Sequence, residues 1–74
     1  MRRYLVIYER GRSGWGAYSP DVPGCIATGK TRALVRKRFR EALGFHLQEL
    51  REAGEPLPAA SSRAEVVSLP AESV

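Results

Sequence analysis

The spacing of hydrophobic residues divides the chain into two parts. Up to residue 28, apolar side chains come in short runs rich in aromatic and β-branched residues, which is typical of strands. From residue 32 onward they recur every three or four positions, as on an amphipathic helix. We therefore expect a small α+β protein of order β-β-β-α-β, with a mostly antiparallel sheet and one long helix packed on one of its faces. The predicted strands cover residues 3–9, 15–19, 25–28 and 64–69, and the helix covers about 32–53.

The first predicted strand is apolar on both faces. Tyr4, Val6 and Tyr8 would lie on one face, and Leu5 and Ile7 on the other. A sheet with one solvated face alternates apolar with polar residues, so we expect the second face to be covered as well.

The predicted helix carries a single narrow apolar stripe. A stripe of this kind is expected of a helix that packs on a sheet. Leu34 and Phe45 lie on a flank outside it, and Gly54 is a natural C-terminal stop. The stripe consists of Val35, Phe39, Ala42, Leu43, His46, Leu47 and Leu50.

The segment 19–31 joins the sheet to the helix and is rich in turn-forming residues. Within Val22-Pro23-Gly24-Cys25, proline and glycine occupy the second and third positions of a type II turn, which needs positive φ at Gly24. Thr31 can cap the helix through its hydroxyl. The residues expected to shape this connection are Pro20, Asp21, Pro23, Gly24, Gly29 and Thr31.

This connection also carries a resemblance. The string P-D-V-P-G-C, followed by Gly29-Lys30-Thr31 and a helix containing Glu41-Ala42-Leu43, resembles the HicB antitoxin family over roughly residues 3–58. The resemblance implies a partial ribonuclease-H-like fold, with a fourth strand parallel to the first. It also implies a non-catalytic domain that binds and blocks a small ribonuclease toxin, HicA. A separate C-terminal domain binds operator DNA in this family, and we expect this chain to be a short form without it.

The size of the chain favours self-association. Seventy-four residues form one domain, 1–74, with a frayed tail at 70–74. Cys25 is the only cysteine, so a disulfide within the chain is excluded, and one His with one Cys cannot complete a zinc site. We expect no cofactor, no signal peptide and no membrane span, and a cytoplasmic location. A homodimer or larger homo-oligomer is then the expected source of extra stability.

Candidate residues for that interface are apolar side chains that one packed helix would leave uncovered. On the helix these are the two residues of the flank. On the sheet they are aromatic residues, for which a plain core position is the alternative. The candidates are Leu34, Phe45, Tyr4, Tyr8 and Trp15.

Charge is unevenly distributed along the helix. The chain has 12 Lys and Arg against 8 Asp and Glu, and six of the cations lie between residues 30 and 40. Arg36, Lys37 and Arg40 share the polar face, where they could contact nucleic acid phosphates or simply be solvated. The corresponding part of the HicB helix is usually acidic, so a small nucleic-acid-associated protein is the alternative function.

The sequence argues against an enzyme. A degenerate metal-dependent nuclease, our third hypothesis, needs several converging carboxylates, but only Glu9 and Asp21 precede Glu41. Cys25 and His46 could be imagined as nucleophile and base, but no third group is placed to orient them. We therefore expect core and turn roles for these residues and no catalytic site.

Overall fold

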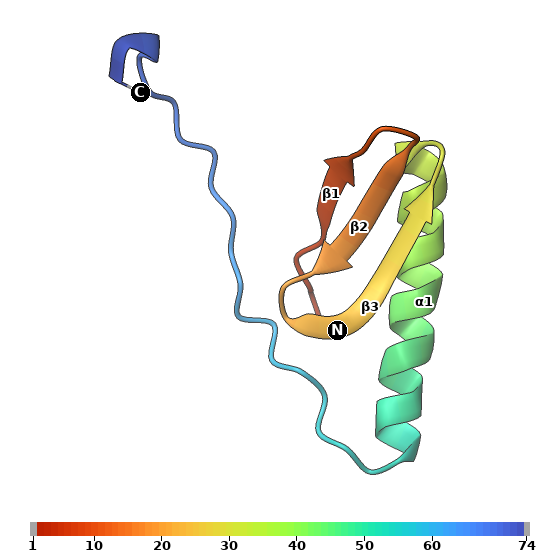
Figure 1. Cartoon of the computed structure of the whole chain (residues 1–74). Coiled ribbons are helices and arrows are strands. Elements are labelled where there is room, and N and C mark those ends of the chain that lie inside the picture. The colour runs from red at the N-terminus through yellow and green to blue at the C-terminus, as the bar shows by residue number, and fades with distance from the viewer. Residues whose placement is uncertain (1, 74) are drawn as a thin grey trace.

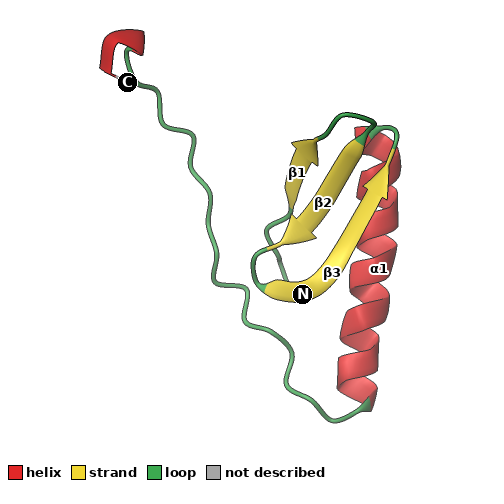
Figure 2. Cartoon of the chain, viewed as in Figure 1, coloured by secondary structure: helices red, strands yellow, loops and turns green. Residues whose placement is uncertain are grey.

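The computed structural model describes residues 2–73 and consists of two layers and a tail. The three strands form one layer and the long helix the other, packed on one face of the sheet (Figures 1 and 2). This arrangement confirms the α+β class and the order of the first four elements. The elements are β1 (Ile7–Arg10), β2 (Trp15–Ser19), β3 (Val22–Gly29), α1 (Arg32–Glu52) and a short 3-10 helix, η1 (Ala71–Ser73).

The sheet is an antiparallel meander of order β1-β2-β3. β1 begins at Ile7, so the strand predicted from Arg3 is shorter than expected. Ile7 pairs with Tyr18, and the chain beyond Tyr18 soon turns away at Pro20. In this register β2 has no residue opposite positions 3–5, and the ladder ends at Ile7.

The core lies where α1 crosses β2 and β3. Its buried members come from all three elements, and Phe39, Val22 and Val35 are each less than 2% exposed. Tyr8 pairs with Ala17, which pairs with Ala27, and this row faces the helix. The core residues are Ala17, Val22, Cys25, Val35 and Phe39.

Both ends of α1 are capped by their own sequence. The Thr31 hydroxyl accepts a hydrogen bond from the Leu34 N–H at 3.1 Å. At the other end, Gly54 adopts a φ of +75°, and the Glu55 N–H reaches back to the Leu50 carbonyl at 2.9 Å. This is the Schellman arrangement, which satisfies carbonyl groups that the helix end leaves unpaired. Over residues 2–73, no helix is both long and apolar enough to cross a membrane.

The prediction of a fourth strand at residues 64–69 is wrong, because the structure describes these residues and they form no strand. The segment 64–69 pairs with no strand, and the sheet has three strands rather than four. Ser61 and Ser62 are tied to Asp21 at the β2–β3 turn. Beyond this point the chain leaves the body instead of joining an edge of the sheet (Figure 1). As a result Val66, the most exposed large apolar side chain of the segment, is 95% exposed.

Candidate partner-binding surface

The segment between β2 and β3 makes two changes of direction. Pro20 and Asp21 form the reversal itself, and Ser19 pairs with Val22 across it. A register shift then follows, because Tyr18 pairs with Ile26. Pro23 and Gly24 lie inside this shift, exposed to solvent, and Gly24 has a φ of +87°. That value suits the third position of a type II turn and is rarely open to side chains with a Cβ.

Gly29 serves close packing rather than a left-handed bend. It is the last residue of β3, and its φ is not among the positive values. A Cβ added there would lie 3.1 Å from Cγ2 of Val35. The strand can therefore approach the first turns of α1 closely, which brings the β3–α1 connection tight against the core.

Asp21 anchors the segment that follows the helix. Its carboxylate accepts hydrogen bonds from the Ser62 hydroxyl at 2.7 Å and the Ser62 N–H at 2.9 Å. The Ser61 N–H adds a third at 3.1 Å. These bonds, led by the Ser62 hydroxyl, lower the pKa of the Asp21 carboxyl below its ordinary value. Sequence reasoning assigned Asp21 to a turn, and its contacts 40 residues away were not predicted.

A second tether lies close to the first. The Tyr4 hydroxyl donates a hydrogen bond to the Pro58 carbonyl at 2.6 Å. Between them, the bonds at Pro58 and at Ser61–Ser62 hold the returning chain against the body over a short stretch. The path of the chain as far as residue 62 is therefore set by specific contacts.

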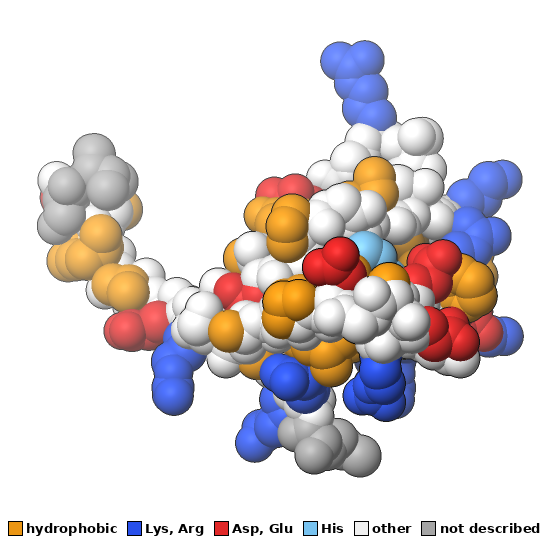
Figure 3. All heavy atoms as spheres, turned by 90° about the horizontal axis from the view of Figure 1, so that it is seen from below, with side chains coloured by type: hydrophobic (Ala, Val, Ile, Leu, Met, Phe, Trp, Pro, Cys, Tyr) orange, Lys and Arg blue, Asp and Glu red, His pale blue; other side chains and the backbone are white. Residues whose placement is uncertain are grey.

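A groove lies between β3 and the second half of α1. It is open to solvent and has a volume of about 500 Å³, and we call it the β3–α1 groove. Ile26 and Phe45 line it and are 70% and 66% exposed. Two acidic residues, Glu41 and Glu49, line it as well. The view from below shows acidic and hydrophobic side chains gathered around the single histidine, His46, with the cations lying further out (Figure 3).

The outer face of the sheet continues this apolar surface. Ile7, Tyr18 and Ile26 are direct cross-strand partners, so they form one row on the face opposite the helix. We call it the outer row. Tyr18 is 37% exposed, and no element of the described chain is packed over this face (Figure 1). Ile26 belongs to both surfaces, so the groove and the outer row are contiguous.

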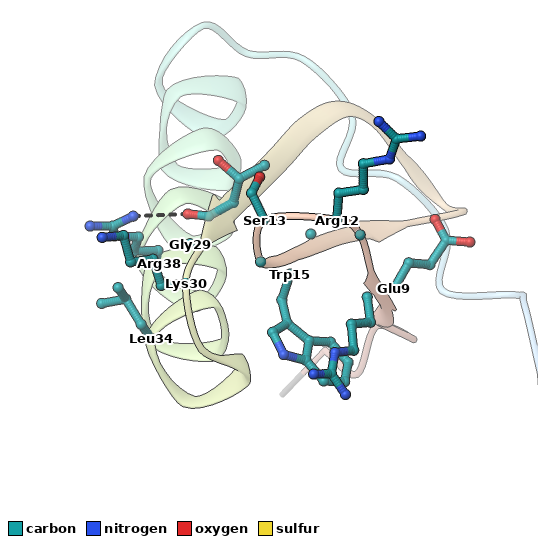
Figure 4. Close-up of a pocket in the computed structure, with 13 residues that line it drawn as sticks. Glu9, Arg12, Ser13, Trp15, Gly29, Lys30, Leu34 and Arg38 are labelled. Atoms are coloured by element: carbon teal, nitrogen blue, oxygen red, sulfur yellow. Dashed lines mark hydrogen bonds between the residues drawn. The ribbon is translucent and has the colours of Figure 1, made fainter.

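The basic residues do not converge on one site. Arg36, Lys37 and Arg40 are all exposed on α1. Near the β1–β2 hairpin, Arg38 donates a hydrogen bond to the Thr28 carbonyl at 2.9 Å. Figure 4 shows Arg38 and Arg12 on different sides of a wide hollow of about 890 Å³ at this end of the molecule. Such a hollow offers several separate cations rather than one phosphate cradle.

The structure brings together only some of the groups considered for catalysis. Glu9 lies beside the β1–β2 hairpin, whereas Asp21 lies at the opposite end of the sheet. The Asp21 carboxylate accepts a hydrogen bond from the Ser62 hydroxyl. Cys25 and His46 do line the same β3–α1 groove. However, burial raises the pKa of the Cys25 thiol, which disfavours the nucleophilic thiolate. Among residues 2–73, no group of three or more His, Cys, Asp or Glu could hold a metal ion.

Most residues predicted for an oligomer interface belong to the core side of the sheet. Tyr4, Tyr8 and Trp15 are half-buried and pack against the core, and Leu34 is half-buried beside Gly29. Phe45 is the one that is freely exposed. The apolar second face was expected from Leu5 and Ile7, but no element of the described chain covers it. Tyr18 and Ile26 were not predicted as part of it, although the alternation in 15–19 and 25–28 was a signal that could have placed them opposite the core.

Taken together, these features define a class of protein. A meander of three strands backed by one helix, with an uncovered sheet face and an apolar groove flanked by acidic residues, is a small two-layer α+β domain. The sequence profile described as the HicB-like antitoxin of the bacterial toxin-antitoxin system matches residues 4–72. The chain belongs to the HicB-like antitoxin family.

A solved structure and two relatives are consistent with this membership. The chain is similar to a protein of the HicA3 and HicB3 toxin-antitoxin complex, with a TM-score of 0.64 and 32% identity, over 84% of this chain and 70% of that one. It is 30% identical to an uncharacterised 14.9 kDa protein of Haemophilus phage HP1, over 90% of this chain and 50% of the relative. It is 28% identical to a UPF0150 protein of Thermoplasma acidophilum, over 76% of this chain and 83% of the relative. The chain thus spans half the length of the phage relative.

Proposed function

We propose that this protein is a non-catalytic antitoxin that neutralises a small HicA-type ribonuclease toxin by binding it through the β3–α1 groove. The observation that carries the proposal is the groove itself. Two large apolar side chains, Ile26 and Phe45, stand 70% and 66% exposed beside two carboxylates. Family membership and the similarity to a protein of a toxin-antitoxin complex support a toxin as the partner.

The chemistry of the groove suits a basic partner with an apolar anchor. A ribonuclease toxin must bind phosphates, so its working surface carries cations. Glu41 and Glu49 would pair with such cations, which favours fast and specific association. Burying Phe45 would add roughly 1.5–3 kcal/mol. The cations of α1 lie mainly on its first half, away from this groove, so they need not oppose the approach of a basic toxin.

The proposal is tested by reversing charge inside and outside the groove. Glu41→Lys with Glu49→Lys should weaken binding to a co-expressed HicA-type toxin by about tenfold or more, because attraction becomes repulsion. Glu52→Lys with Glu55→Lys is the matched control, since it changes net charge equally at exposed positions beyond the groove. Binding is measured by titration calorimetry, and neutralisation by growth of cells that express the toxin.

Three outcomes decide between explanations. Loss in the groove variant alone supports the proposal. Equal loss in both variants would mean that overall charge, and not the groove, governs binding. Full binding by both would assign the toxin to another surface. Phe45→Ser provides an independent check, because it removes the apolar anchor without changing charge.

Nucleic acid binding is a second candidate function, favoured by the exposure of Arg36, Lys37 and Arg40 along one face of α1. Replacing all three by Gln should weaken binding to RNA and DNA and flatten its salt dependence by about three phosphate contacts. Fluorescence anisotropy at several salt concentrations is the measurement. No binding by the parent protein at low salt would leave these residues as a solvated face.

Self-association accompanies either function in our proposal. The outer row of Ile7, Tyr18 and Ile26 is apolar and lacks a covering element in the described chain. A second copy is the simplest cover for such a surface, because two-fold homodimers are the commonest assemblies.

A further inference from the structure

The segment Ala64–Leu69, which we call the tail segment, has the composition of a strand but no strand to pair with. It reads Ala-Glu-Val-Val-Ser-Leu and is followed by Pro70, which cannot donate to a ladder. Val66, Val67 and Leu69 are 95%, 65% and 65% exposed. Three large apolar side chains at this exposure within four positions are unusual on a finished surface.

The tail segment lies outside the body of the molecule. The radius of gyration is 15.0 Å, whereas a compact chain of this length would have about 11 Å. The longest dimension is 52 Å against 28 and 19 Å for the other two. Figure 1 shows why, since the chain beyond the Asp21 contacts runs away from the sheet on the β1 side. The tethers at Pro58 and Ser61–Ser62 set the point at which it departs.

The same molecule has an unpaired sheet edge. In the order β1-β2-β3, β1 pairs only with β2, so its other side offers free N–H and C=O groups. Residues 3–6, which lead into β1, also lack a ladder partner. The tail segment would extend about 20 Å as a strand, a length that eight residues of this edge can accommodate. Each chain therefore has an unpaired strand-like segment and an unpaired sheet edge that do not meet within the chain.

We propose that the tail segment of each copy adds to the β1 edge of a second copy, so that two chains exchange their fourth strands. The inference rests on the proposed self-association and specifies how it occurs. Reciprocal exchange satisfies two edges at once and closes the assembly with two-fold symmetry. Because side chains alternate along a strand, Val67 and Leu69 would lie on one face of the added strand and Val66 on the other. Either orientation therefore places an apolar side chain of the tail segment on the face of Ile7, at the end of the outer row, so that apolar surface of both copies is buried together.

The first test is a proline in the tail segment of the full chain. Val67→Pro removes a backbone donor and should raise the dimer dissociation constant by about tenfold or more. Ala59→Pro is the matched control, at an exposed position before the tail segment, and should leave dimerisation unchanged. Analytical ultracentrifugation across the micromolar range measures both. Since position 67 touches none of the core, circular dichroism should show the same fold in each variant.

The second test identifies which copy supplies the strand. Two differently isotope-labelled preparations are mixed, and filtered NMR experiments detect only contacts between chains. Contacts between amides of 64–69 and those of 3–10 across the two labels support exchange. The same contacts present in unfiltered spectra of one preparation but absent from the filtered spectra would overturn it in favour of a strand folded back on its own β1.

The remaining outcomes separate this inference from self-association in general. A dimer that Val67→Pro leaves intact would overturn strand exchange but keep self-association. A monomer throughout the concentration range would overturn both. Toxin binding by the β3–α1 groove is measured independently of either result.

Discussion

The two sides of this sheet are stabilised in very different ways. Beneath β2 and β3, the helix seals a core in which Val35 and Phe39 are fully buried. At the β1 edge and along the tail segment, apolar side chains such as Val66 stand in solvent and backbone groups lack partners. The packed side buries its apolar residues with no contribution from a partner molecule. The second has the chemistry of an interface, which suggests that folding and partner binding are assigned to separate parts of a very small molecule.

The sharpest way to test this division is to damage the packed side. Phe39→Ala should destabilise the protein by roughly 3–5 kcal/mol, because it leaves a cavity at the centre of the core. A domain of 74 residues has a total stability of about 4–11 kcal/mol, so the variant would be partly or wholly unfolded. Urea denaturation followed by circular dichroism measures this. The matched change Phe45→Ala, at a side chain that is 66% exposed, should cost far less.

The turn that leads into β3 should come second in effect. Gly24→Val should lower stability by about 1–3 kcal/mol, since a β-branched residue is strained at the φ of +87° found there. The strain, not crowding, is the cause, because a Cβ at this position would meet no atom within 4 Å. Thermal unfolding is the measurement, and an unchanged melting temperature would contradict the assignment. Gly44→Ala, a helical glycine that is equally uncrowded, is the control and should be neutral or stabilising.

The smallest global effect is expected where the tail leaves the body. The pKa of Asp21 is lowered in the folded state, so its contribution to stability is present above the ordinary Asp pKa and is lost as pH falls through the lowered folded value. Acidification through that range should therefore release the chain at Ser61 and Ser62 while the core persists. Amide hydrogen exchange of residues 61 and 62 reports this release. Asp21→Asn should mimic it at neutral pH, and simultaneous loss of the core would contradict the separation of the two sides.

Much of the local structure could be predicted from residue types alone. Thr31 before an amphipathic run and Gly54 before two prolines specify where α1 starts and stops, because caps act through atoms close by in sequence. The apolar stripe of the helix likewise identified the residues that face the sheet, such as Val35 and Phe39. Positive φ at Gly24 followed from its place after a proline.

The candidate site was less accessible to sequence reasoning. Glu41, Phe45 and Glu49 are spaced to share one side of a helix, but only the crossing of α1 over β3 sets them beside Ile26. The family resemblance indicated a toxin as partner without indicating which surface would bind it. Placement of Tyr8 and Trp15 on the core side was equally a matter of which face the helix covers.

The sequence by itself determined the first three strands and the helix, their order, the helix caps and the family, since each of these depends on neighbours within a few residues or on a short motif. Only the tertiary structure decided that Asp21 would hold Ser61 and Ser62, that the tail segment would stay out of the sheet, and that a groove would form between β3 and α1. The physical reason is the sequence separation over which each interaction acts. Periodicity and turn chemistry act locally, whereas a strand pairs, or fails to pair, according to where distant hydrogen bonds direct the chain.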